Sequence, residues 1–349
     1  MSNIEKKATS AIRILSADAI QKANSGHPGL PLGVADITYE LWANHMKHSP
    51  ENPKWINRDR FVLSAGHGSM LLYSLLHLFG YGNLSIEDLK SFRQLDSLTP
   101  GHPEYGHTVG VEATTGPLGA GMGMAVGMAM AETHLASVFN KDGFNVIDHF
   151  TYVLGGDGCM MEGISSEAFS LAGHLGLSKL IVLYDSNSIS IEGSTDLAFS
   201  EDVSKRMEAF GFQVIEVDDG HDLVKVSKAI EEAKNNKEKP SFINLKTRIG
   251  FGCPAKEGKA SAHGEPLGAD NIKSLRENLG WEYEEPFFVP EEVYEHYKSK
   301  ASELKKVEQA WDELLKKYFA AFPEKKTLWD RYFVEEDLSF LDKDEYWAW

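Results

Sequence analysis

The spacing of apolar positions along the chain changes between two periods, and each period predicts one kind of element. Near the N-terminus, four apolar residues recur at helical spacing on one stripe: Ala8, Ile12, Leu15 and Ala19. This pattern predicts a helix over residues 4–23 that ends at the turn-forming sequence 24–26. Further patterns predict a helix over residues 34–46, a short strand over 60–64 and a helix over 69–78.

The centre of the chain alternates most regularly between short buried runs and amphipathic stretches. The short runs are rich in β-branched and aromatic residues and predict strands over residues 150–154, 179–184, 212–217 and 241–246. The amphipathic stretches predict helices over residues 164–175 and 223–235. Strands that alternate with helices in this way are typical of right-handed βαβ units. We therefore expect an α/β fold whose open, mostly parallel sheet carries helices on both faces.

The last third of the chain has a different pattern. Strand signals fade after about residue 266, residues 289–322 are charged with helical periodicity, and seven aromatic residues follow between Trp329 and Trp349. That aromatic density is too high for a solvated tail. We expect three parts: an α/β domain over residues 1–265, a connecting helical segment over 266–322, and an aromatic and acidic docking segment over 323–349.

Charge and cysteine content narrow the possible partners and location. The chain has 52 acidic and 35 basic residues, and its formal net charge is −17. Such a chain gains no counterion-release energy from nucleic acid and little attraction to anionic lipid, so we expect neither as a partner. The two cysteines, Cys159 and Cys253, cannot form a disulfide framework. With no signal-peptide pattern and no apolar run of membrane-spanning length, we expect a soluble cytoplasmic protein.

Two oxygen-bearing side chains stand directly after predicted strands in the central βαβ unit. Asp157 lies between Gly156 and Gly158 after the first strand, and Asn187 follows the second. Because parallel strands end at the same edge of a sheet, we expect both side chains to converge there. A carboxylate, an amide oxygen and a backbone carbonyl near Ile189 suit a hard cation such as Mg²⁺. Gly-Asp-Gly alone also suits a tight turn, but its spacing to Asn187 favours a metal site.

Four histidines share a second pattern, since each lies outside regular structure and is flanked by glycine or proline. They are His27, His67, His102 and His263. Histidine can donate a hydrogen bond to phosphate or hydroxyl groups and can exchange protons near neutral pH. An isolated loop histidine is often only a surface residue or a cap, but four in similar frames favour a functional cluster. No cysteine and histidine spacing here suggests zinc.

Together these residues lie in motifs of a known family. From about residue 9 to residue 322, this chain resembles the N-terminal, diphosphate-binding half of transketolase. The motifs that carry the resemblance are SGHPGLPLG (25–33), DRFVLSAGHGS (59–69), GHPEYGHTVGVEATTGPLG (101–119), GGDGCMMEGISSEAFSLAGHLG (155–176), DSNSISIEG (185–193) and SAHGEPLG (261–268). Deoxyxylulose-phosphate synthase shares the Gly-Asp-Gly element, but its family lacks the His-Pro-Gly, Gly-His-Pro-Glu and Ala-His-Gly motifs. It therefore ranks as a more distant alternative.

The resemblance implies thiamine diphosphate and Mg²⁺ as cofactors, with Ca²⁺ or Mn²⁺ as possible substitutes for the metal. It assigns the metal to Asp157, Asn187 and the backbone of Ile189. It assigns the cofactor's diphosphate and rings to His67, Gly116, Pro117, Leu118, Gly158, Asn187 and His263. It implies catalytic histidines that stabilise oxyanions and move protons in ketol transfer between sugar phosphates: His27, His102 and His263.

Two departures from the family pattern bear on function. Ser188 stands where the family often has a second asparagine or a glycine. A complete transketolase also continues into a pyrimidine-binding domain, which carries the glutamate that activates the cofactor, and a C-terminal domain. We therefore expect the N-terminal subunit of a split transketolase, in a homodimer or heterotetramer with a separate pyrimidine-binding subunit. A non-catalytic cofactor-binding or interaction paralogue is the alternative, and the donor and acceptor sugars stay open.

Overall fold

The structure, a computed structural model, describes residues 1–334, 339–343 and 347–348. Its centre is a five-stranded sheet in the order β1-β2-β3-β7-β6, in which every neighbouring pair is parallel. The strands are β1 (Arg60–Leu63), β2 (Thr151–Gly156), β3 (Leu180–Ser186), β6 (Gln213–Val217) and β7 (Ser241–Lys246). A separate two-stranded ribbon pairs β4 (Ile189–Ser190) with β5 (Gly193–Ser194). The predicted α/β class with a parallel sheet is confirmed.

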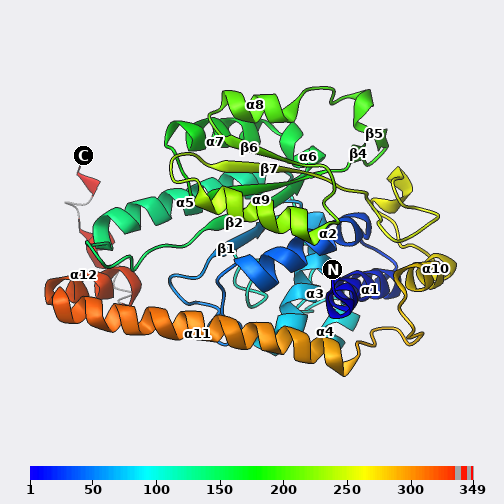
Figure 1. Cartoon of the computed structure of the whole chain (residues 1–349), viewed down its shortest axis with the longest axis horizontal. Helices are drawn as coiled ribbons and strands as arrows, with labels where there is room; N and C mark the ends of the chain where they lie inside the picture. Colours follow the sequence, from blue (N-terminus) through cyan, green and yellow to red (C-terminus); the bar gives the residue numbers. More distant parts are fainter. Residues whose placement is uncertain (335–338, 344–346, 349) are drawn as a thin grey trace.

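Helices cover both faces of the sheet (Figure 1). One face carries α5 (Ala120–Phe139), α7 (Gly163–His174) and α8 (Val203–Ala209), and the other carries α9 (Leu223–Asn235) with α2 (Gly29–Glu40) behind it. The remaining helices are α1 (Asn3–Ala23), α3 (Ser69–Phe79), α4 (Ile86–Lys90), α6 (Asp157–Met161), α10 (Ala269–Leu279), α11 (Glu291–Ala321) and α12 (Pro323–Phe333). No helix within the described ranges is both long and apolar enough to cross a membrane.

The register of the two central strands determines where the candidate site forms. β2 and β3 are apolar and buried along almost their whole length, as strands covered on both faces must be. Gly156 is the register partner of Asp185, so the two strands end side by side. The segments that start at Asp157 and at Asn187 therefore leave the sheet at one edge.

Helix α2 differs from the expectation that a helix would begin at residue 34. It begins at Gly29, and a π-helical turn over Leu41–His45 continues it. Its early glycines are needed for packing, because a Cβ at Gly29 would come within 2.6 Å of the Ala262 carbonyl oxygen. At Gly33 a Cβ would come within 3.0 Å of the Arg248 carbonyl oxygen. The glycines therefore indicate close approach of this helix to the 248–262 segment, and they do not interrupt it.

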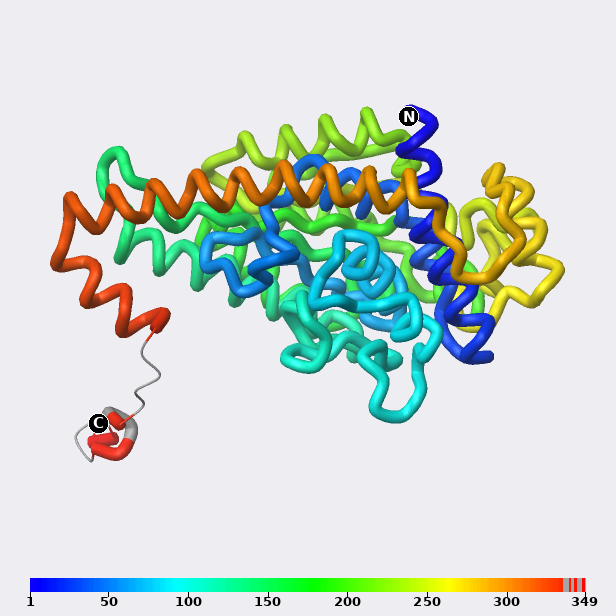
Figure 2. The backbone as a smooth tube through the Cα atoms, turned by 90° about the horizontal axis from the view of Figure 1, so that it is seen from below, coloured from blue at the N-terminus to red at the C-terminus, as the bar shows by residue number. Residues whose placement is uncertain are grey.

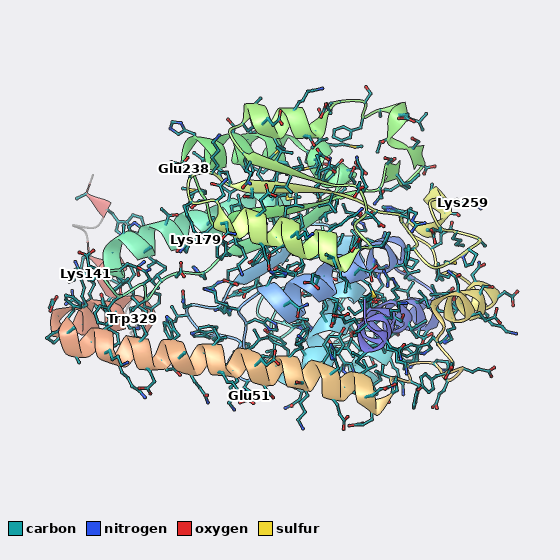
Figure 3. The ribbon with its side chains drawn as sticks, viewed as in Figure 1. Glu51, Lys141, Lys179, Glu238, Lys259 and Trp329 are labelled. Carbon is teal, nitrogen blue, oxygen red and sulfur yellow. The ribbon has the colours of Figure 1, made fainter. Side chains whose placement is uncertain are left out.

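The helical C-terminal region packs partly on the main core and partly on a second apolar cluster. Figure 2 shows the long helix α11 running along the molecule and α12 turning back from its far end. There Trp329 is 3% exposed and packs with Trp55, Phe139, Trp311 and Tyr318. The Tyr318 hydroxyl and the Trp311 indole donate to the carbonyls of Phe139 and Val146, at 2.5 and 2.8 Å. Figure 3 shows Trp329 at this end of the molecule.

The proposed boundaries at residues 265 and 322 fall before α10 and between α11 and α12. Residues on both sides of the first boundary, such as Leu275 and Leu15, belong to one continuous core, and the three-part division stays a prediction. Within the proposed docking segment, Trp329 and Phe333 contact their own chain, with ring centroids 5.1 and 5.6 Å from that of Phe139. Residues 335–338, 344–346 and 349 of that segment lie outside the described residues.

We expect Trp329→Ala to lower the free energy of unfolding by about 3–5 kcal/mol, because it empties a buried aromatic site. Urea unfolding followed by circular dichroism measures the change. Val334→Ala is the matched control in the same segment, since Val334 is 67% exposed and should cost little. An unchanged unfolding midpoint for Trp329→Ala would contradict a stabilising role for this cluster.

Candidate active site

The carboxyl edge of the sheet brings Asp157 and Asn187 together as the sequence predicts. Asp157 begins α6 directly after β2, and Asn187 is the first residue after β3. The Ser188 backbone N–H donates to Asp157 Oδ2 at 3.2 Å, which joins the two segments. The Tyr184 hydroxyl donates to Asp157 Oδ1. Asp157 is only 5% exposed, and burial raises the pKa of its carboxyl group.

The side-chain amide of Asn187 is held in one orientation by two hydrogen bonds. Its Nδ2 donates to Asp185 Oδ2 at 2.8 Å, and its Oδ1 accepts from the Ile189 backbone N–H at 3.0 Å. Asp185 is 1% exposed and also accepts from the Thr247 hydroxyl at the end of β7. Burial, with a smaller contribution from the charge of Asp157, raises the pKa of Asp185 to about 6. An amide oxygen held in this way keeps a free lone pair for a cation.

Three of the four predicted histidines form a compact cluster. The ring centroids of His27 and His67 are 5.1 Å apart, those of His67 and His263 are 5.1 Å apart, and those of His27 and His263 are 5.6 Å apart. The rings of His67 and His263 are stacked, and the ring of His27 makes a T-shaped contact with each of them. His67 lies in a short 3-10 helix, Gly66–Gly68, and not outside regular structure as expected. Three segments that are far apart in the sequence therefore supply one imidazole wall.

Burial keeps this cluster neutral at physiological pH. Desolvation, reinforced by neighbouring imidazoles, lowers the pKa of His67 to about 3. The pKa of His27 falls to about 4 for the same reasons, with a contribution from the Arg93 charge. Burial also lowers the pKa of His263 and of His102. Neutral imidazoles each carry one donor and one acceptor nitrogen, so this wall can both give and take hydrogen bonds.

The oxygen site and the histidine cluster face a single cavity of about 410 Å³. Among the residues that line it are nine of the predicted site residues: His27, His67, Gly116, Leu118, Asp157, Gly158, Asn187, Ile189 and His263. His102 and Pro117 lie outside this lining. A Cβ on Gly116 would come within 3.2 Å of His102 Cδ2, so the His102 ring packs against the backbone of the cavity wall.

Sequence reasoning missed several polar residues that support the site. Asp185 stands two residues before Asn187, in the quoted DSNSISIEG motif, and its position at a strand end could have indicated it. Tyr184 and Thr247 lie on strand ends whose register only the fold reveals. Arg93 reaches Ser25 and His27 from a loop without a recognisable motif.

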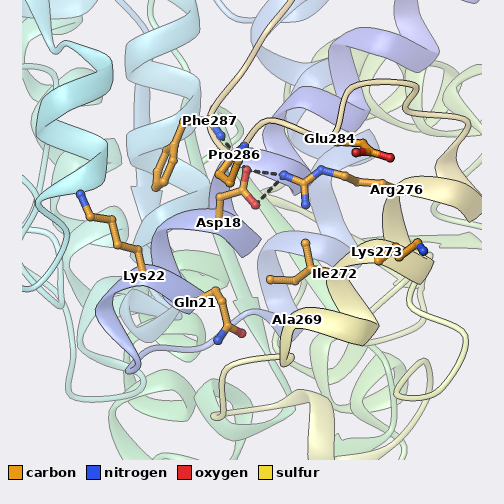
Figure 4. Close-up of a pocket in the computed structure, with 10 residues that line it drawn as sticks. All are labelled: Asp18, Gln21, Lys22, Ala269, Ile272, Lys273, Arg276, Glu284, Pro286 and Phe287. Carbon is orange, nitrogen blue, oxygen red and sulfur yellow. Dashed lines mark hydrogen bonds and ion pairs between the residues drawn. The ribbon is translucent and has the colours of Figure 1, made fainter.

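A larger cavity of about 580 Å³ lies elsewhere, between α1 and α10, and contains none of the predicted site residues (Figure 4). Arg276 Nη2 donates to both carboxylate oxygens of Asp18 at 2.7 Å, and the Phe287 backbone N–H donates to the same carboxylate at 2.8 Å. Nearby, Gln21 Oε1 accepts from the Gly268 backbone N–H at 2.8 Å. These bonds hold together two helices that lead to the His27 and His263 loops.

The polar groups that line this cavity fit a divalent cation and a diphosphate. Asp157 and Asp185 are two buried carboxylates whose hydrogen bonds come from uncharged groups, so a bound cation would offset their charge. The set of carboxylate, amide and backbone oxygens is the chemistry that Mg²⁺ prefers. Gly158 leaves the adjacent wall open, since a Cβ there would come within 2.9 Å of Leu118 Cδ1.

Comparison with known proteins agrees with this geometry. The family model described as "Transketolase, thiamine diphosphate binding domain" matches residues 4–337. Fold and site together therefore define a thiamine diphosphate-binding domain. The chain belongs to the transketolase family, and the resemblance noted from its motifs is confirmed.

Individual relatives show how much of a transketolase this chain spans. It is 58% identical over 325 residues to the transketolase of Bacillus subtilis, covering 93% of this chain and 49% of the relative. The corresponding enzyme of Halalkalibacterium halodurans is 57% identical over 322 residues, with coverages of 92% and 48%. A crystal structure of Pichia stipitis transketolase with sedoheptulose 7-phosphate matches with a TM-score of 0.90 at 49% identity, covering 93% of this chain and 48% of that one. The chain thus spans about half the length of these relatives.

The lowered histidine pKa values predict that the fold loses stability in mild acid. In the unfolded chain histidine has a pKa of about 6.5, so below that pH the unfolded state binds protons that the folded cluster refuses. The contribution of His67 is fully present above about pH 6.5 and is lost as the pH falls toward about 3. His67→Gln should therefore lessen the drop in unfolding free energy between pH 7 and pH 5.

Urea unfolding at the two pH values measures this difference. His134→Gln is the matched control, because His134 is exposed on α5 and should leave the pH dependence unchanged. The same drop in wild type and His67→Gln would contradict the neutral, desolvated state of His67.

Proposed function

We propose that this chain is the thiamine diphosphate-binding half of a transketolase that transfers a two-carbon ketol unit between sugar phosphates. The observation that carries the proposal is the convergence of an oxygen-ligand site and a neutral histidine cluster on one cavity. We expect these residues to work together with a second, pyrimidine-binding half. The named relatives, each about twice the matched length, support a need for that second half.

In this proposal three residues hold Mg²⁺, for which Ca²⁺ or Mn²⁺ could substitute. Asp157 provides the anionic ligand, Asn187 provides Oδ1 and Ile189 provides its backbone carbonyl. Asp185 supports the second ligand by holding the Asn187 Nδ2 group, so that the oxygen is the atom presented. Such outer partners often matter for metal affinity nearly as much as the ligands themselves.

The cavity wall binds the rest of the cofactor in two parts. His67, His263, Gly158 and Asn187 would hold the diphosphate with hydrogen bonds and an open backbone. The segment of Gly116, Pro117 and Leu118 would lie against the rings. When bound, thiamine diphosphate supplies a carbanion that attacks a ketose carbonyl and an electron sink for carbon–carbon cleavage.

The histidines act on the sugar substrates. His27 and His263 face the cavity, and His102 lies beside it, so all three can meet a sugar hydroxyl or carbonyl above the cofactor. Their pKa values lie below the ordinary one, which leaves them uncharged and able to donate hydrogen bonds to a developing oxyanion. Proton transfer by a positioned histidine contributes about 10²–10⁴-fold to rate.

Exposed apolar side chains on the neighbouring helices α5 and α7, together named the α5–α7 surface, support assembly with a second copy of this chain. Its side chains have exposed fractions between 40% and 45%: Met124, Met130, Ile164, Leu171 and Leu175. Gly127 on α5 faces open space, which allows the backbone of a neighbouring chain to approach closely. We propose that this surface forms the contact between copies in a homodimer or in a heterotetramer with the partner subunit.

For the metal site, we expect Asp157→Ala to weaken Mg²⁺-dependent thiamine diphosphate binding at least ~10-fold, about 1.4 kcal/mol, because it removes the anionic ligand. Isothermal titration calorimetry measures the affinity. Asp218→Ala is the control, since Asp218 is exposed and should leave binding unchanged. Equal affinities for Asp157→Ala and wild type would overturn the metal assignment.

For the activity, we expect no ketol transfer by the purified chain alone and restored turnover when a pyrimidine-binding subunit is added. In the restored complex His263→Ala or His102→Ala should lower kcat by ~10²-fold through lost proton transfer or oxyanion stabilisation. A coupled assay of aldose phosphate formation measures it, with Asp218→Ala as control, since Asp218 is exposed and lies outside the cavity and the proposed contact. Turnover by residues 1–349 alone would rule out the need for a second half, and binding without transfer in the complex would favour a non-catalytic role.

For the assembly, we expect Leu171→Glu to separate the copies, because a charge cannot be buried in an apolar contact without a partner. Light scattering should then report about half the wild-type mass. Val224→Glu is the matched control, because Val224 is an exposed apolar residue on α9, away from this surface. A wild-type chain that is already monomeric would contradict the proposed contact.

A further inference from the structure

We propose that Arg93, which no motif singles out, is a positioning residue that holds His27 as a neutral imidazole with its proton on Nε2. The role would make His27 a hydrogen-bond donor toward substrate and would exclude it as a base. The catalytic meaning of this inference rests on the proposed function. The contact between Arg93 and His27, and the tautomer that it selects, depend only on residues of this chain.

Arg93 is anchored before it reaches His27. Its Nη1 donates to Ser25 Oγ at 2.7 Å, and its Nη2 donates to His27 Nδ1 at 3.4 Å. Its own backbone adopts a positive φ of 62° and donates from N–H to the Thr99 carbonyl at 3.0 Å. Gly101 gives the side chain room, since a Cβ there would come within 3.1 Å of Arg93 Nε.

The donor chemistry of arginine determines the tautomer. A guanidinium has five N–H donors, no acceptor, and a charge that it keeps at every physiological pH. A ring nitrogen that faces it at hydrogen-bond distance must therefore accept, so His27 Nδ1 carries the lone pair. Neutral imidazole has one proton, and that proton must then lie on Nε2.

The opposite edge of the His27 ring, which belongs to the cavity lining, lies beside Gly264. A Cβ placed on Gly264 would come within 3.2 Å of His27 Cδ2 and 3.4 Å of Nε2. Glycine at position 264 therefore leaves this edge uncovered, next to the His263 ring. With Nδ1 engaged by Arg93 and Nε2 protonated, His27 has no lone pair free toward the cavity and can only donate there.

The charged and titratable groups around His27 all favour this neutral state. They come from four separate segments of the chain: Arg93, His67, His102 and His263. The positive charge of Arg93 opposes a second positive charge on the ring, and the three imidazoles are themselves uncharged near neutral pH. The pKa of His27, at about 4, agrees with the geometry.

The roles of the clustered histidines therefore differ. His27 is restricted to donating a hydrogen bond from Nε2, which suits a hydroxyl or a developing oxyanion on a sugar. Proton abstraction would fall to another histidine, whose lone pair is not taken by a cation. Arg93 thus restricts the His27 imidazole to the role of hydrogen-bond donor.

Nitrogen-15 NMR of the imidazole groups in the full chain, without cofactor, tests the tautomer directly. In wild type at pH 7 we expect His27 with Nε2 protonated and Nδ1 bare. Arg93→Met keeps the length of the side chain and removes all donors, so the tautomer ratio should shift about tenfold toward the Nδ1-protonated form. Its loss of charge should also raise the pKa of His27. Arg93→Lys keeps a donor and a charge and should restore the wild-type tautomer.

Arg331 is an exposed residue of α12, and Arg331→Met is the matched control. It should change neither the tautomer ratio nor the pKa of His27. A wild-type His27 with the proton on Nδ1, or an Arg93→Met spectrum identical to wild type, would overturn the inference. The tautomer ratio and the pKa of His27 are measured without cofactor and without turnover. Failure of thiamine diphosphate binding would therefore count against the proposed function alone. In the restored complex, a fall in kcat for Arg93→Met with KM nearly unchanged would support the donor role, and unchanged kcat would contradict it.

Discussion

The parallel pairing of β2 and β3 is the constraint on which the site depends. Their register places Gly156 beside Asp185, so both chains leave the sheet at one edge. Two residues thirty positions apart then share a cavity, and β7 adds Thr247 by pairing on the other side of β3. A shift of one residue in this register would exchange the faces of the sheet to which the side chains of one strand point, and it would separate the oxygen groups.

Much of this arrangement could be predicted from the sequence, because local pattern and topology agree. The helix expected over residues 223–235 has those bounds in the structure, and the strand over residues 241–246 does as well. Asp157 and Asn187 were identifiable because strand ends in a parallel sheet converge by rule. The start of α2 was not, because glycine and proline usually mark a break, and here tertiary contact with the 248–262 segment requires them.

The contacts among the supporting residues could not be predicted from the sequence, for a different reason. Thr247 and Asp185 meet only through strand pairing, and Arg93 meets His27 only through a loop with an unusual positive φ. Such contacts depend on side-chain direction across elements, which periodicity does not encode. The histidine frames were visible, yet the order of the rings within the cluster, and the place of His102 behind Gly116, came from three-dimensional packing.

The two apolar clusters also differ in how they can open. The main core joins the sheet to α1, α2 and α3. The second cluster includes Trp311 of α11 and Trp329 of α12, and Figure 3 shows Trp329 at the end of the molecule where these helices meet. Separate cores commonly open as separate cooperative units, each with its own free energy. Amide protons of α12 can then exchange with solvent through local opening while those of β2 and β3 wait for global unfolding. Local opening of α12 therefore leaves the strands at the cavity edge folded.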